Sequence, residues 1–222
     1  LVQGVLREAE AGLPEGFGEF RIVRRIASGG MGVVYEAEQV SMRRIVALKV
    51  LYPSVTLRPK AVERFRREAQ AAANLTHSGV VAIHDWGEDD GTYFMVMELV
   101  QGQNLRDVVR AEGTLKPRRV AQIGFEVAAA LSAAHAQGLV HRDIKPANIY
   151  LCRRGLVHDF VKVLDFGLVK AVAGYGRDQS ALTQQHVATG TPAYMAPEVA
   201  MAEDQVDGRT DLPRETDLLR YA

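Results

Sequence analysis

The stretch of sequence that decides the fold is His141-Arg142-Asp143-Ile144-Lys145-Pro146-Ala147-Asn148. Asp143 offers a carboxylate that can accept a hydroxyl proton, and Lys145 offers a cation that can offset the charge of a phosphoryl group. Asn148 adds a neutral oxygen of the kind that Mg²⁺ prefers as a ligand. This spacing predicts phosphoryl-transfer chemistry. The alternative is a polar turn with an Asx cap.

A second motif follows at Asp165-Phe166-Gly167. It is preceded by the apolar stretch Val161–Leu164, so the carboxylate of Asp165 is expected at the end of a strand. A three-residue match is common by chance, but its position after Asp143 and Asn148 makes it specific. Asn148 and Asp165 together predict an Mg²⁺ site.

A glycine cluster lies upstream, at Gly29-Gly30-Met31-Gly32, between two stretches with strand character. Glycines at such a turn let backbone N–H groups approach an anion closely, although a tight hairpin explains them equally well. Lys49 follows in the apolar stretch Ile45–Leu51, where a lysine needs a partner. Glu68 on the next predicted helix is the candidate partner. The alternative reading makes both residues surface charges.

The hydrophobic pattern divides the chain near residues 100–104. Before this point it predicts five strands and one helix; after it, mostly helix, including a long amphipathic helix over Val120–His135. The expected strands are 20–26, 33–37, 45–51, 80–84 and 93–98, and the helix begins at Pro59. We therefore expect a leader at 1–17, one lobe at 18–100 and a second lobe at 101–222.

The bulk composition excludes several classes of function. Lys and Arg number 27 and Asp and Glu also 27, so no net charge favours nucleic acid as a partner. One cysteine, Cys152, permits no internal disulfide and indicates a reducing compartment. No apolar run approaches the ~18 residues of a membrane helix. We expect a cytoplasmic protein without a membrane segment in this chain.

Taken together, the motifs resemble those of eukaryotic-like serine/threonine protein kinases, and of their bacterial members in particular. The resemblance covers roughly residues 18 to 212. It implies an α+β, two-lobed fold with a five-stranded N-lobe that carries one helix, and a mainly helical C-lobe. It also implies transfer of the ATP γ-phosphoryl group to Ser or Thr hydroxyls of proteins, with ATP and Mg²⁺ as cofactors. A kinase-domain dimer is a possible assembly, and longer relatives often carry a membrane helix.

The resemblance assigns roles residue by residue. Lys49 holds the α- and β-phosphates and pairs with Glu68, Asp143 is the catalytic base, and Asn148 and Asp165 hold Mg²⁺. The implied ATP-binding residues are Ile26, Gly29, Gly30, Gly32, Val34, Ala47, Lys49, Met97, Glu98, Val100 and Tyr150. Among these, Met97 is the gatekeeper, and the backbone of Glu98 and Val100 binds adenine. The first glycine of the family's glycine-rich loop is replaced here by Ala27.

The segment after Asp165 resembles an activation segment that ends in Gly190–Glu198. In this resemblance, Thr191 belongs to the substrate-facing loop. Thr183 and Thr189 are candidate phosphorylation sites, with ordinary loop threonines as the alternative. A phosphate there would pair with Arg142, beside the catalytic base.

The resemblance ends after Leu212. Asp211 resembles the aspartate that opens the central helix of the large lobe, but residues 213–222 are too polar to continue a buried helix. We therefore expect a truncated large lobe and low or no activity of the chain alone. The alternatives are a small-molecule phosphotransferase and a non-enzymatic nucleotide-binding remnant or scaffold.

Overall fold

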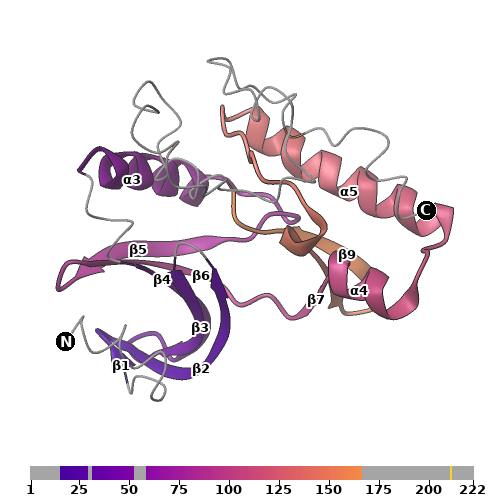
Figure 1. The fold of residues 1–222 in the computed structure, drawn as a ribbon. Coiled ribbons are helices and arrows are strands. Elements are labelled where there is room, and N and C mark those ends of the chain that lie inside the picture. The colour runs from indigo at the N-terminus through magenta and orange to yellow at the C-terminus, as the bar shows by residue number, and fades with distance from the viewer. Residues whose placement is uncertain (1–15, 30–31, 53–58, 167–210, 212–222) are drawn as a thin grey trace, which may run out of the picture.

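The computed structural model describes residues 16–29, 32–52, 59–166 and 211. It has two lobes: a curved sheet with one helix, and a mainly helical lobe with a smaller sheet (Figure 1). The chain passes from one lobe to the other between Glu98, which ends strand β6, and Gly102, which begins strand β7. The expected two-lobed α+β architecture is therefore confirmed.

The larger sheet has six strands in the order β1-β2-β3-β4-β6-β5, all antiparallel to their neighbours. Its strands are β1 (Gly16–Phe17), β2 (Phe20–Gly29), β3 (Gly32–Gln39), β4 (Arg44–Leu51), β5 (Ile83–Asp89) and β6 (Thr92–Glu98). The sequence predicted five of them. It missed β1, which falls within the expected leader, because a two-residue strand shows no alternation. The strand expected from residue 80 begins only at Ile83.

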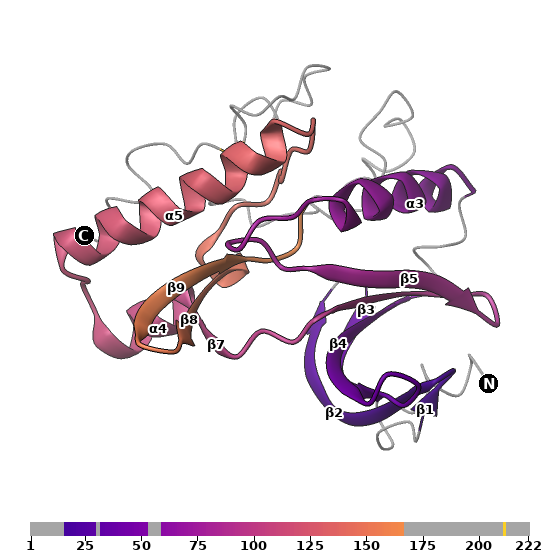
Figure 2. The same cartoon turned by 180° about the vertical axis from the view of Figure 1, so that it is seen from behind.

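One face of this sheet closes on an aromatic core, around which β2, β3 and β4 curl (Figure 2). The rings of Phe17 and Phe20 both meet the ring of Phe94 edge to face, with centroids 5.4 and 5.6 Å away. Phe17 is buried although it lies in the expected leader, so β1 is part of the packed sheet.

Helix α3 (Pro59–Ala73) lies beside β5 on the other face (Figure 1). A second apolar cluster forms on this side, in which Ala69 of α3 packs with Met95 of β6 and Trp86 of β5. Helix α3 begins at Pro59, as the sequence predicted; proline is favoured in the first turn because it lacks the N–H that would remain unpaired there.

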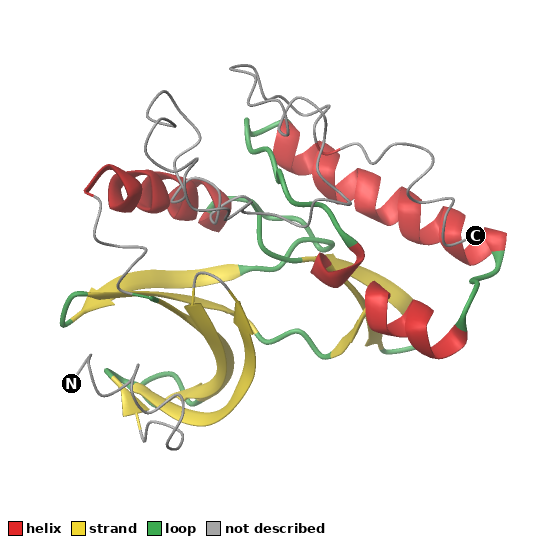
Figure 3. Ribbon diagram, viewed as in Figure 1, coloured by secondary structure: helices red, strands yellow, loops and turns green. Residues whose placement is uncertain are grey.

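Helices dominate the second lobe (Figure 3). Its elements are β7 (Gly102–Asn104), α4 (Leu105–Glu112), α5 (Pro117–His135), the 3₁₀ turn η1 (Pro146–Asn148), β8 (Ile149–Arg154) and β9 (Val157–Val163). The side chain of Asn104 caps α4 by accepting the N–H of Asp107 at 2.9 Å. Among the described residues, no helix is long and apolar enough to cross a membrane.

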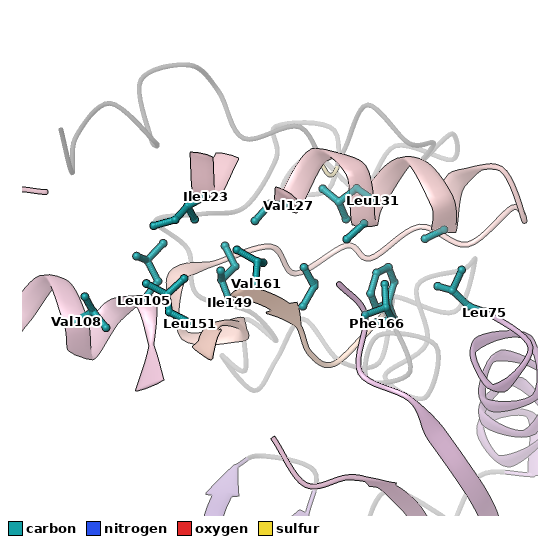
Figure 4. Packing of buried hydrophobic residues seen from close by; sticks show 14 of the residues in the cluster. Leu75, Leu105, Val108, Ile123, Val127, Leu131, Ile149, Leu151, Val161 and Phe166 are labelled. Carbon is teal, nitrogen blue, oxygen red and sulfur yellow. The ribbon is translucent and has the colours of Figure 1, made fainter. Parts of the chain in front are cut away.

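The core of this lobe lies between α5 and the sheet β7-β8-β9 (Figure 4). Ile123, Val127 and Leu131 are spaced by four residues and project from one face of α5. They pack toward Ile149 in β8 and Val161 in β9. This packing fixes β8, which directly follows Asn148, and β9, which ends two residues before Asp165; these two residues are the expected metal ligands.

Candidate active site

The structure brings Asp143, Lys145 and Asn148 into direct contact. Lys145 Nζ donates to Asp143 Oδ2 at 2.7 Å. Asn148 Nδ2 donates to the backbone oxygen of Asp143 at 2.9 Å and to its Oδ2 at 3.3 Å. Asn148 is held in turn by η1, where its N–H donates to the carbonyl of Lys145 at 2.9 Å.

These contacts leave two oxygens for chemistry. Among the described residues, both side-chain bonds of Asp143 use Oδ2, so Oδ1 remains to orient a hydroxyl group and accept its proton. Asn148 uses its amide nitrogen toward Asp143, so its Oδ1 remains to act as a metal ligand. The orientation of this amide is assigned from the hydrogen bonds.

Lys49 and Asp165 form an ion pair across the two lobes, with Lys49 Nζ 2.6 Å from Asp165 Oδ1. Burial by itself raises the pKa of the Asp165 carboxyl. The charge and the hydrogen bond of Lys49, together with smaller electrostatic contributions from His141 and Lys145, outweigh this effect, and the pKa lies below its ordinary value. Asp165 is therefore ionised at neutral pH, as a metal ligand must be. The expected Lys49–Glu68 pair lies outside the described residues, because the side chain of Glu68 is not described.

His141 links the catalytic loop to the segment that carries Asp165. Its ring is fully buried, and its Nε2 donates to the carbonyl of Leu164 at 2.8 Å. Its Nδ1 accepts the N–H of Asp143 at 3.2 Å, which assigns the neutral tautomer. Burial lowers the pKa of His141 and keeps the ring neutral, and the ring packs against Phe166 with centroids 4.7 Å apart.

Asp211 anchors the same loop from much further along the chain. Its side chain is fully buried, and Oδ2 accepts the N–H of His141 at 2.5 Å and Nε2 of His135 at 2.9 Å. Oδ1 accepts the N–H of Arg142 at 2.5 Å. Arg142 has a φ of 63°, an unfavourable value for arginine, so these bonds hold a strained loop in place. The sequence offered a family likeness for Asp211 but no local signal for these contacts.

The expected adenine-contacting side chains are only partly brought together. Ala47 and Met97 are buried in one apolar cluster, against which Val34, Val100 and Leu164 pack. Two other expected residues lie outside this cluster: Ile26, 38% exposed in β2, and the half-buried Tyr150 in β8.

The expected phosphate-binding glycines lie at the turn between β2 and β3. Gly29 pairs with Gly32, and Gly30 lies outside the described residues. A Cβ on Gly32 would sit 2.1 Å from the carbonyl oxygen of Val50, so the sheet itself requires glycine at this position. At Gly29 a Cβ would meet nothing within 4 Å, so packing does not explain that glycine.

The remaining predicted residues are in the activation-like segment. Thr183, Thr189, Thr191 and the stretch Gly190–Glu198 all lie outside the described residues.

Asn148 and Asp165 fit a magnesium ion. Both offer oxygen, and the N–H of Leu164 donates to the backbone carbonyl of Asn148 at 2.9 Å, which ties the two ligand-bearing segments together. Mg²⁺ commonly takes one or two carboxylates and completes its shell with phosphate oxygens and water. A site with few protein ligands therefore suits a metal that arrives with a nucleotide.

The chain also matches known proteins over most of its length. The family model described as "Protein kinase domain" matches residues 20–212. The chain therefore belongs to the protein kinase domain family.

Relatives within that family include serine/threonine-protein kinases of bacteria. The chain is 43% identical over 195 residues to the serine/threonine-protein kinase pkn3 of Myxococcus xanthus, covering 87% of this chain and 35% of pkn3. It is 41% identical over 196 residues to PknD of Mycobacterium tuberculosis, covering 88% of this chain and 28% of PknD. The chain thus spans about a third of the length of these relatives. A crystal structure of the M. tuberculosis PknI kinase domain superposes with a TM-score of 0.70 and 31% identity, covering 90% of this chain and 72% of that one.

Proposed function

We propose that this chain is the catalytic part of a protein serine/threonine kinase, which transfers the γ-phosphoryl group of ATP to Ser or Thr hydroxyls of proteins. One observation carries the proposal: Asp143 is held by Lys145 and Asn148, while His141 joins this loop to the segment with the Lys49–Asp165 pair. Base, phosphate-binding cations and metal ligands thus belong to one connected site.

The catalytic loop acts mainly by positioning and charge. Oδ1 of Asp143 orients the attacking hydroxyl and accepts its proton as the oxygen–phosphorus bond forms and the bond from the γ-phosphorus to the oxygen of the leaving ADP breaks. Lys145, fixed to the other oxygen of Asp143, offsets negative charge on the transferred group. Asn148 and Asp165 hold Mg²⁺, which when bound neutralises charge on the phosphate oxygens.

Lys49 binds the α- and β-phosphates in this proposal, so it exchanges its bond to Asp165 for bonds to the nucleotide. Asp165 would then be available as a metal ligand. The apolar side chains of the cluster around Ala47 and Met97 would bind the adenine ring, and the backbone of Glu98 and Val100 would supply its hydrogen bonds.

Preference for Ser and Thr follows from the order Asp143-x-Lys145-Pro146-x-Asn148 and from the names of the relatives. Recognition of the protein substrate by Thr191, phosphorylation at Thr183 or Thr189, a kinase-domain dimer and a cytoplasmic location belong to the same proposal.

Radiolabelled ATP tests the proposal directly. Label from the γ-phosphate is expected on a generic basic protein, at a low rate, at Ser and Thr, and to depend on Mg²⁺. Transfer to a panel of small alcohols instead would show a small-molecule phosphotransferase. Thermal stabilisation by nucleotide without any transfer would show a nucleotide-binding module and contradict the proposal.

A further inference from the structure

A second ion pair, besides that of Lys49 and Asp165, joins the two lobes. Glu98 at the end of β6 and Lys162 in β9 meet at 2.7 Å between Oε2 and Nζ. Their side chains are only 33% and 14% exposed. The family resemblance gives Lys162 no role, yet it lies three residues before the metal ligand Asp165.

Both side chains also bind the connection between α3 and β5. Oε2 of Glu98 accepts the N–H of Ala82 at 3.2 Å, and the N–H of Glu98 donates to the carbonyl of Ala82 at 2.9 Å. Nζ of Lys162 donates to the carbonyl of Val80 at 3.2 Å. These bonds therefore join three segments: the end of β6 at Glu98, residues 80–82, and β9 at Lys162.

The same connection is bonded to the backbone of β9. The N–H of Val81 donates to the carbonyl of Val163 at 3.0 Å, and the N–H of Val163 donates to the carbonyl of Gly79 at 2.8 Å. This explains why the expected strand at residues 80–84 begins late: Val80 and Val81 pair with β9 instead of β6. The crossing lies where the segment leading into β5 passes the end of β9 (Figure 2). The next residue, Leu164, donates to the carbonyl of Asn148.

The surroundings of this pair differ from those of surface pairs in the same chain. Arg24 and Glu36 also form an ion pair, but the Arg24 side chain is 63% exposed, and such a contact constrains little. The Lys162 side chain is mostly buried, and its Nζ donates to a carboxylate and to a carbonyl. A charge this poorly hydrated needs both partners, so it fixes the distance between β6 and β9.

We propose that Glu98 and Lys162 are positioning residues for nucleotide binding. Their ion pair holds Glu98, which leads into the interlobe connection at residues 99–101, at a fixed distance from β9. It thereby also fixes the position of the adenine-binding backbone at residues 98–100 relative to Asp165. Neither side chain touches ATP in this role. The inference rests on the proposed kinase function, and it adds that ordering of the connection is completed before the nucleotide binds, which raises affinity.

The test compares Lys162→Met, Lys162→Arg and the surface control Arg24→Met in the purified protein. Lys162→Met is expected to raise both KM and Kd for ATP about fivefold, because binding must then order the connection. Its kcat is expected to stay within about twofold, because Asp211 and His141 hold the catalytic loop independently. Lys162→Arg keeps the charge and is expected to restore most of the affinity. Arg24→Met is expected to change neither constant.

Calorimetric titration with ATP separates the possible failures. Unchanged or tighter nucleotide binding in Lys162→Met, with normal binding in the wild type, would overturn the inference and leave the kinase proposal intact. A wild type that binds no ATP would overturn both. If Lys162→Met does not fold, Glu98→Gln replaces it: the amide keeps an acceptor for Ala82 but loses the charge. Weaker ATP binding by Glu98→Gln is then expected, and wild-type affinity would overturn the inference.

Discussion

In the larger sheet, each of β2, β3 and β4 pairs with the strand next to it in the sequence, whereas the catalytic loop takes its main-chain anchors from distant residues. The bonds from Asp211 reach back 70 residues to His141 and 69 to Arg142. A β-sheet is stabilised by many backbone hydrogen bonds, each of which contributes a modest free energy. The catalytic loop instead depends on a few long-range bonds, and one buried carboxylate, that of Asp211, accepts two of its backbone N–H groups.

The larger sheet and the catalytic loop also contribute to the site in different ways. The sheet and its two apolar clusters build the nucleotide side of the site, and neither cluster contains a residue of the catalytic loop. The loop supplies the chemistry, and its strained backbone needs support from both Leu164 and Asp211. Substitutions in the two regions are therefore expected to differ both in size and in kind.

The largest expected effect is on catalysis. Asp143→Asn removes the proton acceptor and is expected to lower phosphoryl transfer by about 10²–10⁴-fold. The sheet is untouched, so stabilisation by nucleotide in a thermal shift assay is expected to remain. Initial rates of label transfer provide the measurement, and wild-type turnover in this variant would remove Asp143 from the role of base.

The next effect tests the remote anchor itself. Asp211→Ala leaves the N–H groups of His141 and Arg142 buried without their acceptor, and is expected to lower the free energy of unfolding by about 3–5 kcal/mol. Urea denaturation measures this. Asp211→Asn keeps one acceptor oxygen and is expected to recover part of the loss. A loss below about 1 kcal/mol in Asp211→Ala would show that the loop does not depend on this carboxylate.

A smaller effect concerns pH. Burial lowers the pKa of His141 in the folded chain, so the unfolded chain binds more protons once the pH falls below about 6.5, the ordinary histidine value. Stability is then expected to be complete above that pH and to fall below it, by at most about 1.4 kcal/mol per pH unit. Melting temperatures between pH 7.5 and 5 give the profile.

The control for this profile is His158→Gln, which changes an exposed histidine in the β8–β9 hairpin. This variant is expected to keep the wild-type decline at low pH. The role of His141 would be contradicted by a flat wild-type profile, or by a decline that disappears in His158→Gln.

The smallest effect is expected on the surface of the sheet. Arg21 pairs with Glu38 across β2 and β3, with the Arg21 side chain 68% exposed. Arg21→Ala is expected to change the free energy of unfolding by only about 0.2–1 kcal/mol, and by less in high salt. Urea denaturation at two salt concentrations checks this; a loss as large as that of Asp211→Ala would remove the contrast between the two regions.

By itself, the sequence determined the two lobes, α5, the strands of the larger sheet except β1, and the group Asp143, Lys145 and Asn148. The lobes, the helix and the strands follow from the hydrophobic periodicity of the sequence. The catalytic group can be recognised because its members lie close together in the sequence, within residues 143–148. Local spacing is enough for both.

Only the tertiary structure decided which polar groups are buried together. It showed Lys49 paired with Asp165, Glu98 with Lys162, and three donors gathered on Asp211. No period or spacing relates these partners, because they lie 64 to 116 residues apart and meet only after the lobes have formed. A buried charge needs a partner, but packing, rather than the pattern of the sequence, selects which one it finds.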